Sequence, residues 1–272
     1  MTLLSVQELA FLFGLLGNIV SFMVFLAPVP TFYKIYKKGS SEGFQAIPYV
    51  VALFSAGLLL YYAYLTKNAF LIVTINAFGC VIELTYIFLF LFYASKKSKM
   101  TTVWLMLLDV GALGIVMLFS YLFAKGTKRV EIVGWICAIV NIAVFAAPLS
   151  IMRQVIKTKS VEFMPFTLSL FLTLCATMWF FYGYFKKDYY IALPNVLGFL
   201  LGIVQMILYI VYKYARRKYN GEWELEGIDI NIKTDGNFEN KIVSSMEKPS
   251  LENGHQSNQE HNRDMTSVLT LK

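Results

Sequence analysis

Seven long apolar stretches, separated by short polar segments, occupy most of the chain up to residue 213. A helix that crosses the roughly 30 Å hydrocarbon core of a bilayer needs about 20 mostly apolar residues. The stretches that meet this requirement are Leu9–Pro28, Ile47–Leu65, Phe70–Ala94, Val103–Ala124, Ile132–Ile151, Phe166–Phe185 and Tyr190–Tyr212. The sequence therefore predicts an all-α membrane protein with seven transmembrane helices.

The composition excludes several other classes of protein. Hydrophobic residues make up 57% of the chain and charged residues 15%, whereas soluble domains average about 45–50% and about 25%. This balance excludes a disordered or collagen-like chain and a nucleic-acid-binding arm. Cys80, Cys137 and Cys175 all lie inside apolar stretches, which excludes a secreted framework of disulfides.

The distribution of Lys and Arg predicts the orientation of the helices. The segments that follow the first, third, fifth and seventh stretches hold 13 Lys and Arg residues, and those on the opposite side hold 6. Basic loops stay in the cytoplasm, so we expect the N-terminus outside the cell and the C-terminus inside. From Glu222 onward the chain has 10 acidic and 5 basic residues, and we expect residues 214–272 to form a disordered cytoplasmic tail.

An internal duplication determines the predicted architecture. The segment Val24-Phe25-Leu26-Ala27-Pro28 recurs, with one change, 120 residues later as Val144-Phe145-Ala146-Ala147-Pro148, and Asn76-x2-Gly79 recurs 119 residues later as Asn195-x2-Gly198. Residues 1–95 and 126–213 are thus predicted to form two three-helix repeats, with residues 96–125 as a linker helix. The linker gives both repeats the same orientation across the membrane. Such 3+1+3 duplications are typical of transporters whose site lies between the halves.

Polar residues at equivalent positions of the two repeats form a candidate binding site. Asn76 and Asn195 are expected about 10 Å inside the membrane, where an amide needs a partner. Two such amides facing each other suit a neutral polyol better than an ion, because they both donate and accept hydrogen bonds; a single one is more often a contact between helices. Trp179 offers an apolar face to a ring, or packs against lipid. The other candidates near mid-span are Ser21 with Asn141, Val24 with Val144, Ser55 with Cys175, and Leu59, the equivalent of Trp179.

Prolines recur at one predicted depth of the membrane. Pro28 and Pro148 end the first and fifth stretches, and Pro48 and Pro165 open the second and sixth. Because a proline removes a backbone hydrogen bond and can kink a helix, these four residues are predicted to act as hinges. Ordinary helix ends are the alternative for each one taken alone.

The ionisable residues inside the predicted spans are Glu83 and Asp109. Glu83 follows Asn76 and Gly79 on one helix face, but its position in the second repeat is occupied by Gly202. We therefore favour a hydrogen-bonding role over proton coupling. No sequence motif of an enzyme, cofactor site or metal site is present. The rival functions are a seven-helix receptor and a proton-coupled small-solute exporter of related layout.

The chain resembles the plant SWEET sugar transporters. The resemblance rests on the segments 25–32 (FLAPVPTF), 74–80 (TINAFGC), 160–166 (SVEFMPF) and 192–198 (ALPNVLG), with the 3+1+3 layout. It implies passive, bidirectional sugar transport by alternating access at the plasma membrane, and homo- or hetero-oligomers with related transporters. It also implies that the four prolines are the family's proline tetrad and that the candidate residues named above line its sugar pocket.

The resemblance implies an extracellular gate at Tyr61 and Asp188. The motifs are most similar to the sucrose-transporting branch of the family. However, Leu59 stands where a second tryptophan is common, and Asn141 is bulkier than the frequent serine. The choice between sucrose and a hexose is therefore left open.

Overall fold

The computed structural model describes residues 5–161, 164 and 166–214, and among them all regular structure is helical. The helices are α1 (Val6–Leu26), α2 (Val29–Lys38), α3 (Ile47–Leu65), α4 (Phe70–Tyr93), α5 (Lys96–Phe123), α6 (Thr127–Val144), α7 (Ala146–Thr158) and α8 (Phe166–Lys186). They are followed by Tyr189–Tyr214, which we call the 189–214 helix. The expected tail, residues 214–272, lies outside the described residues except for Tyr214.

Seven helical spans long and apolar enough to cross a membrane are present in the described part, as predicted. The first and fifth are longer than expected, at Val6–Lys38 and Thr127–Thr158. The prediction ended them at Pro28 and Ile151. Instead α1 ends at Leu26 and a second helix begins at Val29, while α6 ends at Val144 and α7 begins at Ala146.

The helix resumes after Pro28 because proline is tolerated at the start of a helix, where its missing N–H is not needed. Thr31 N and Phe32 N both donate to Pro28 O, at 2.9 and 3.1 Å. The new helix runs on to Gly39, whose positive φ of 65° terminates it.

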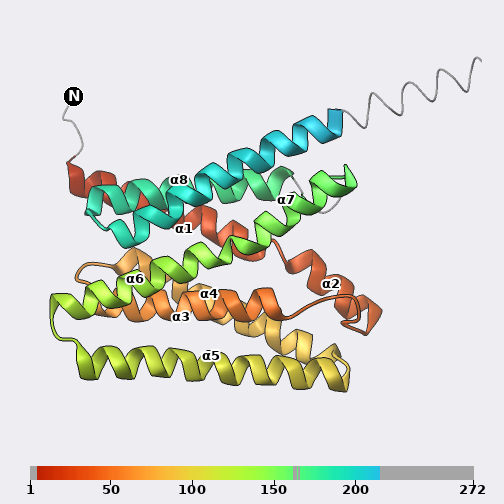
Figure 1. Cartoon of the computed structure of the whole chain (residues 1–272), viewed down its shortest axis with the longest axis horizontal. Helices are drawn as coiled ribbons and strands as arrows, with labels where there is room; N and C mark the ends of the chain where they lie inside the picture. The colour runs from red at the N-terminus through yellow and green to blue at the C-terminus, as the bar shows by residue number, and fades with distance from the viewer. Residues whose placement is uncertain (1–4, 162–163, 165, 215–272) are drawn as a thin grey trace, which may run out of the picture. The chain divides into compact units, whose positions relative to one another are not determined.

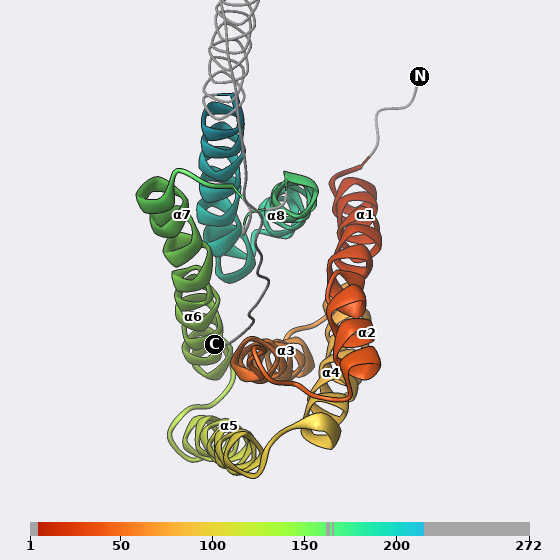
Figure 2. The same cartoon turned by 90° about the vertical axis from the view of Figure 1, so that its right-hand side faces the viewer.

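α1, α3 and α4 form one group, and α6, α8 and the 189–214 helix form the other (Figures 1 and 2). In the first group α4 packs against both α1 and α3. Between the groups α1 packs against α8, and α3 packs against α6. Since α1 corresponds to α6 and α3 to α8 in the duplication, these two contacts are equivalent. α5 packs against α3 and α6 and therefore connects the groups, as the 3+1+3 layout requires.

Matching glycine contacts relate the two groups. A Cβ on Gly79 would lie 2.6 Å from the ring of Phe25, and one on Gly198 would lie 2.9 Å from the ring of Phe145. These pairs are separated by the offsets of 119 and 120 found in the sequence. Each glycine thus allows a phenylalanine to approach its helix closely, in the same way in both repeats.

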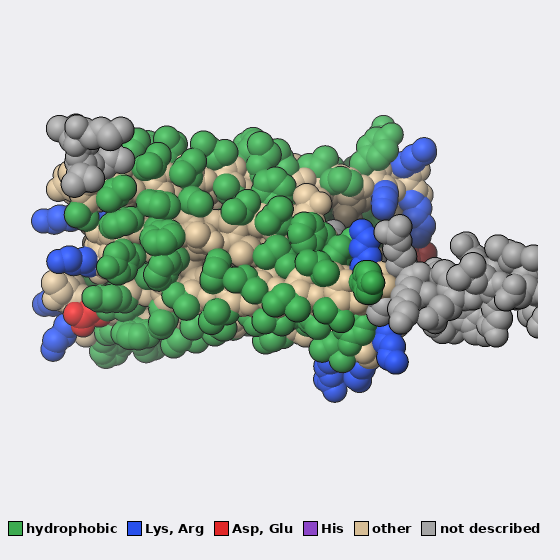
Figure 3. Space-filling view, turned by 90° about the horizontal axis from the view of Figure 1, so that it is seen from above, with side chains coloured by type: hydrophobic (Ala, Val, Ile, Leu, Met, Phe, Trp, Pro, Cys, Tyr) green, Lys and Arg blue, Asp and Glu red, His purple; other side chains and the backbone are tan. Residues whose placement is uncertain are grey.

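On the face shown in Figure 3, apolar side chains cover the surface between two ends that carry Lys and Arg. α5 shows this strongly, because its large apolar side chains are mostly exposed; for example, Trp104 is 65% and Leu108 69% exposed. This surface is that of a protein in lipid, where exposed apolar side chains carry no cost.

The buried core differs between the two ends of the bundle. We call the end with Asp188 the Asp188 end and the end with Pro28, Pro48 and Pro148 the proline end. At the Asp188 end a single shared cluster joins both repeats: Leu58, Tyr61, Tyr62, Ala63, Ala69, Leu71, Ile72, Val133, Cys137, Tyr182 and Ile191. Toward the proline end, separate clusters form around Phe32 and Phe90 in the first repeat and around Met152 and Val155 in the second. The repeats are therefore fastened together at the Asp188 end.

Candidate functional site

A cavity of about 340 Å³ lies between the two repeats, a size typical of sites for small molecules. Its walls come from α1, α3 and α4 of the first repeat and from α6, α8 and the 189–214 helix of the second. The lining residues are Ser21, Val24, Phe25, Ala52, Ser55, Ala56, Leu59, Ile72, Ile75, Asn76, Asn141, Val144, Phe145, Trp179, Tyr190, Ile191, Pro194 and Asn195. None of them is charged, so the cavity suits an uncharged ligand.

Nine of the ten predicted binding residues line this cavity, and Cys175 is the exception. The Sγ of Cys175 lies 3.0 Å from the Oγ of the lining residue Ser21. Cys175 therefore contacts a lining residue without lining the cavity itself.

Asn76 and Asn195 line the cavity from the two repeats with the same local geometry. Asn76 Nδ2 donates to Ile72 O at 2.8 Å, and Asn195 Nδ2 donates to Ile191 O at 2.7 Å. Each bond spans one helical turn, from residue i to residue i−4. Among the described residues neither amide oxygen accepts a side-chain hydrogen bond, so both are available to a ligand hydroxyl. Asn76 is only 9% exposed, which places its amide inside the bundle and away from lipid.

Two polar contacts beside the cavity, one at each contact between the repeats, involve equivalent residues. Ser55 Oγ donates to Asn141 Oδ1 at 3.0 Å across the α3–α6 contact, and the Ser21–Cys175 contact crosses the α1–α8 contact. Ser21 is the equivalent of Asn141 and Ser55 of Cys175. The duplication thus places one polar pair in each of the two contacts between the repeats.

Trp179 is held in a defined orientation at the cavity wall. Its Nε1 donates to Ser21 Oγ at 3.0 Å, and its ring meets that of Tyr182 edge to face at 5.3 Å. Gly17 leaves room for the indole on α1, because a Cβ there would lie 3.1 Å from it. The equivalent position across the cavity is Leu59, so the aromatic wall is one-sided, as the sequence predicts.

The sequence analysis did not select several lining residues, although the duplication contains them in pairs. Phe25 and Phe145 stand inside the repeated segment itself. Ile72 and Ile191 precede the two asparagines by one turn. These residues have apolar side chains that carry no hydrogen-bonding group. Their recurrence at offsets of 120 and 119 was the available signal.

Three of the four predicted hinge prolines are described, and they lie at breaks or starts of helices at the proline end. Pro28 precedes α2, Pro148 lies in the first turn of α7, and Pro48 lies in the first turn of α3. Pro165 lies outside the described residues. Two of the predicted hinges thus accompany interruptions of a long helix.

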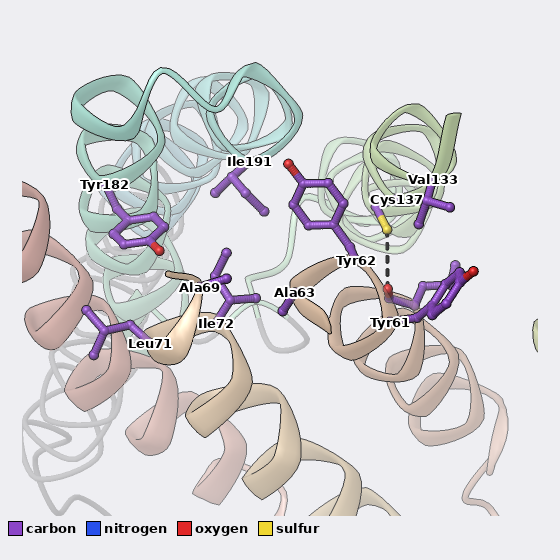
Figure 4. Close-up of a cluster of buried hydrophobic side chains, with 11 residues drawn as sticks. Tyr61, Tyr62, Ala63, Ala69, Leu71, Ile72, Val133, Cys137, Tyr182 and Ile191 are labelled. Atoms are coloured by element: carbon purple, nitrogen blue, oxygen red, sulfur yellow. Dashed lines mark hydrogen bonds between the residues drawn. The ribbon is translucent and has the colours of Figure 1, made fainter. Parts of the chain in front are cut away.

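At the Asp188 end the structure links Asp188 to Tyr62, the residue after the predicted Tyr61. Tyr62 Oη donates to Asp188 Oδ2 at 2.9 Å, and Ile191 N donates to Asp188 Oδ1 at 3.2 Å. Burial raises the pKa of the Asp188 carboxyl, although these hydrogen bonds act in the opposite direction. Tyr61 instead contacts Ser120 of α5 and Arg129 of α6. Figure 4 shows the two tyrosines leaving α3 in different directions.

Glu83 and Asp109 do not line the cavity. Glu83 is 5% exposed, and its Oε2 has no hydrogen-bond partner among the described residues. For Glu83 Oε2, the predicted hydrogen bond is therefore not found in the described part of the chain. The same residues contain no group of three or more His, Cys, Asp or Glu side chains placed to hold a metal ion.

Comparisons with known proteins agree with the duplicated fold. Residues 11–98 and 131–217 match the family described as "Sugar efflux transporter for intercellular exchange". The chain is 70% identical to the bidirectional sugar transporter NEC1 of Petunia hybrida over 91% of the chain and 97% of that protein. It is 60% identical to the bidirectional sugar transporter SWEET9 of Arabidopsis thaliana over 77% of the chain and 82% of that protein.

A solved structure of a eukaryotic SWEET transporter shares the fold. The TM-score is 0.74 at 38% sequence identity, over 77% of this chain and 99% of that one. The two matched segments of the family coincide with the two repeats on either side of α5. The chain belongs to the SWEET family of sugar transporters.

Proposed function

We propose that this protein carries sugars in both directions across the plasma membrane, without a coupling ion. The observation that carries the proposal is the uncharged cavity between the repeats, with one asparagine amide from each side and one tryptophan face. A sugar presents hydroxyls that donate and accept hydrogen bonds, and its ring has apolar faces. Amide groups and an indole match both features.

Alternating access is the proposed mechanism. The repeats are joined at the Asp188 end and have separate cores at the proline end. Rocking of one repeat against the other would break the shared cluster and bring the proline ends together. The interruptions near Pro28 and Pro148 are the proposed hinges, with Pro48 and Pro165 completing the set. Both arrangements are populated as long as their free energies differ by no more than a few kcal/mol.

The proposed orientation has the N-terminus outside the cell, in agreement with the excess of Lys and Arg at the proline end. The arrangement described here is then closed to the outside. We also propose the boundaries 1–95 and 126–213 for the repeats, 96–125 for the linker helix and 214–272 for a cytoplasmic tail. Assembly into homo- or hetero-oligomers within the bilayer is proposed from the family alone.

The proposed substrate is sucrose or a glucose-type hexose. Leu59 opposite Trp179 supplies no second stacking surface, and Asn141 narrows the cavity from α6. Both features favour the smaller sugar, whereas the motif resemblance favours sucrose. Competition between unlabelled sucrose and labelled glucose in one assay separates them.

The test is uptake and efflux of labelled sugar in cells that lack their own sugar transport. We expect flux in both directions that is insensitive to an imposed pH gradient. The double variant Asn76→Ala/Asn195→Ala should lose it, with surface expression measured in parallel. The matched control is Val81→Ala, which changes a 65% exposed residue of α4. Flux that collapses with the pH gradient would support the coupled exporter instead, and unaltered flux in the double variant would refute the site.

A further inference from the structure

Two consecutive tyrosines at the end of α3 reach two different helices of the second repeat. Tyr62 bonds Asp188, which precedes the 189–214 helix. Tyr61 bonds Arg129, in the first turn of α6. Because neighbouring residues on a helix point about 100° apart, a single helix end holds two separate elements.

The contact between Arg129 and Tyr61 consists of more individual interactions than the contact between Tyr62 and Asp188. Arg129 Nη2 donates to Tyr61 Oη at 2.6 Å and its Nε to the same oxygen at 3.1 Å. The guanidinium carbon lies 5.6 Å from the centre of the Tyr61 ring and 5.0 Å from that of the Tyr121 ring, within the range of cation–π attraction. The positive charge thus lies between an aromatic residue of α3 and one of α5.

α5 braces this contact from the other side. Tyr61 Oη and Ser120 Oγ are 2.8 Å apart, and Ser120 Oγ also donates to Met117 O at 3.0 Å. Tyr61 is 8% and Ser120 4% exposed, so the hydroxyl pair is shielded from solvent. Hydrogen bonds to a charged group are stronger than neutral ones, and more so away from water.

The equivalent contact between the repeats has a different chemistry. The positions related to Arg129 and Tyr61 are Leu9 and Phe181. On that side, between α1 and α8, the ring of Phe13 lies 4.8 Å from that of Phe181 and 5.7 Å from that of Phe185. One side of the closed end is therefore held by apolar rings, and the other by a directional polar contact. α5 has no counterpart in the duplication, which explains why only one side has this brace.

We propose that Arg129 is a positioning residue that holds the α3–α6 side of the Asp188 end closed, with Ser120 and Tyr121 of the linker helix α5 as its support. α5 then stabilises the closed Asp188 end in addition to connecting the two repeats. The inference rests on the proposed alternating access, because it concerns the stability of one of its two arrangements. It does not depend on which sugar is carried.

Cys137 provides a native reporter of this closure. It is 1% exposed within the shared cluster, where its Sγ donates to Leu58 O at 3.5 Å (Figure 4). A charged maleimide reaches it only when the Asp188 end opens. Cys80 of α4 lies outside this cluster and serves as the internal control.

The experiment measures the rate of maleimide labelling of each cysteine in the full chain in lipid nanodiscs, by peptide mass spectrometry. For Arg129→Ala we expect labelling of Cys137 to rise about tenfold or more, the equivalent of losing one charged hydrogen bond, with Cys80 unchanged. Tyr61→Phe should give a similar rise, and the double variant little more than either alone, because both remove one interaction. Arg129→Lys keeps the charge without the two-pronged geometry and should fall between. The matched control is Lys128→Ala, which removes the neighbouring exposed charge.

Three results would overturn the proposal. The first is wild-type labelling of Cys137 in Arg129→Ala while Tyr62→Phe accelerates it. The second is an equal rise at Cys80 and Cys137, which indicates general destabilisation of the fold. The third is full additivity of Arg129→Ala and Tyr61→Phe. Sugar flux is measured separately, so a failure of the transport hypothesis leaves this result readable.

Discussion

Ser55 donates a 3.0 Å hydrogen bond to Asn141, at the point where the first repeat meets the second beside the cavity. Its symmetry equivalent is the contact between Ser21 and Cys175. The two contacts occupy equivalent places, but the side chains differ in size: an amide faces the cavity on one side and a hydroxyl on the other. The side chain that lines the cavity from α6 is therefore larger than its equivalent on α1.

Replacing Asn141 with serine should widen the cavity and change the choice of sugar. We expect Asn141→Ser to raise the ratio of sucrose flux to glucose flux about tenfold, the scale on which a small change of pocket volume discriminates between substrates. Competition uptake of the two labelled sugars measures the ratio. Ile139→Val, a change on the exposed face of the same helix, should leave it unaltered. A ratio that is equal in Asn141→Ser and wild type would show that α6 does not set the size limit.

We expect Trp179 to contribute to sugar transport through the face of its indole ring more than through its N–H group. Trp179→Phe keeps an aromatic face and loses the bond to Ser21, so most of the flux should remain. Trp179→Leu removes the face and should lower flux about tenfold, the value of one aromatic contact. Labelled-sugar uptake at matched surface expression tests both. Trp104→Leu, at a lipid-facing site of α5, is the control, and equal losses in Trp179→Phe and Trp179→Leu would assign the role to the indole N–H.

Gly79 and Gly198 should tolerate no side chain, since a Cβ would press on Phe25 or Phe145. Gly79→Ala is expected to destabilise the fold by about 1–3 kcal/mol through overpacking. Gly114→Ala is the matched control, because nothing lies within 4 Å of a Cβ there, and it should stabilise α5 by up to about 1 kcal/mol. Thermal unfolding in detergent compares them. The double variant Gly79→Ala/Phe25→Leu should recover part of the loss, and no recovery would place the strain elsewhere.

Asp188 should make stability depend on pH. Burial raises its pKa in the folded protein, so the folded state holds the proton more tightly than the unfolded chain. The contribution of Asp188 to stability is therefore fully present below the carboxyl's ordinary pKa of about 3.9 and is lost as the pH rises through the raised value. Melting temperatures of wild type and Asp188→Asn across this range should diverge as the pH increases, with the variant showing the flatter profile. Parallel profiles would contradict the assignment.

We expect Pro28 to affect the rate of sugar transport more than the stability of the fold. Pro28→Ala restores a backbone N–H at the break between α1 and α2, so stability should stay equal or rise. Sugar flux should fall about tenfold or more if the break is a hinge that the cycle needs, a barrier change of about 1.4 kcal/mol. Pro30→Ala, in the exposed first turn of α2, is the matched control. Normal flux in Pro28→Ala with an unchanged melting temperature would remove Pro28 from the hinges.

Much of the site could be predicted because the duplication is visible in the amino-acid sequence. Equivalent positions in two repeats have equivalent environments, so the sequence alone predicts that Asn76 with Asn195, and Ser21 with Asn141, line one cavity. Phe25 and Phe145 show the same recurrence at an offset of 120, but the prediction did not include them. Cys175 is the predicted binding residue that does not line the cavity. Helical periodicity predicts the face of the helix on which a side chain lies, but not which neighbouring side chains separate it from the cavity.

The number of spans, their duplication and the pairs of corresponding residues all follow from the sequence alone. These properties depend on hydropathy, length and spacing, which are local along the chain. Three features depend on three-dimensional packing. Asp188 bonds Tyr62, Tyr61 contacts Arg129 and α5, and the first and fifth spans continue as helices after their breaks. Those outcomes depend on how helices distant in sequence rotate and slide against each other. One residue of rotation, about 100° on a helix, exchanges the partners of neighbouring side chains.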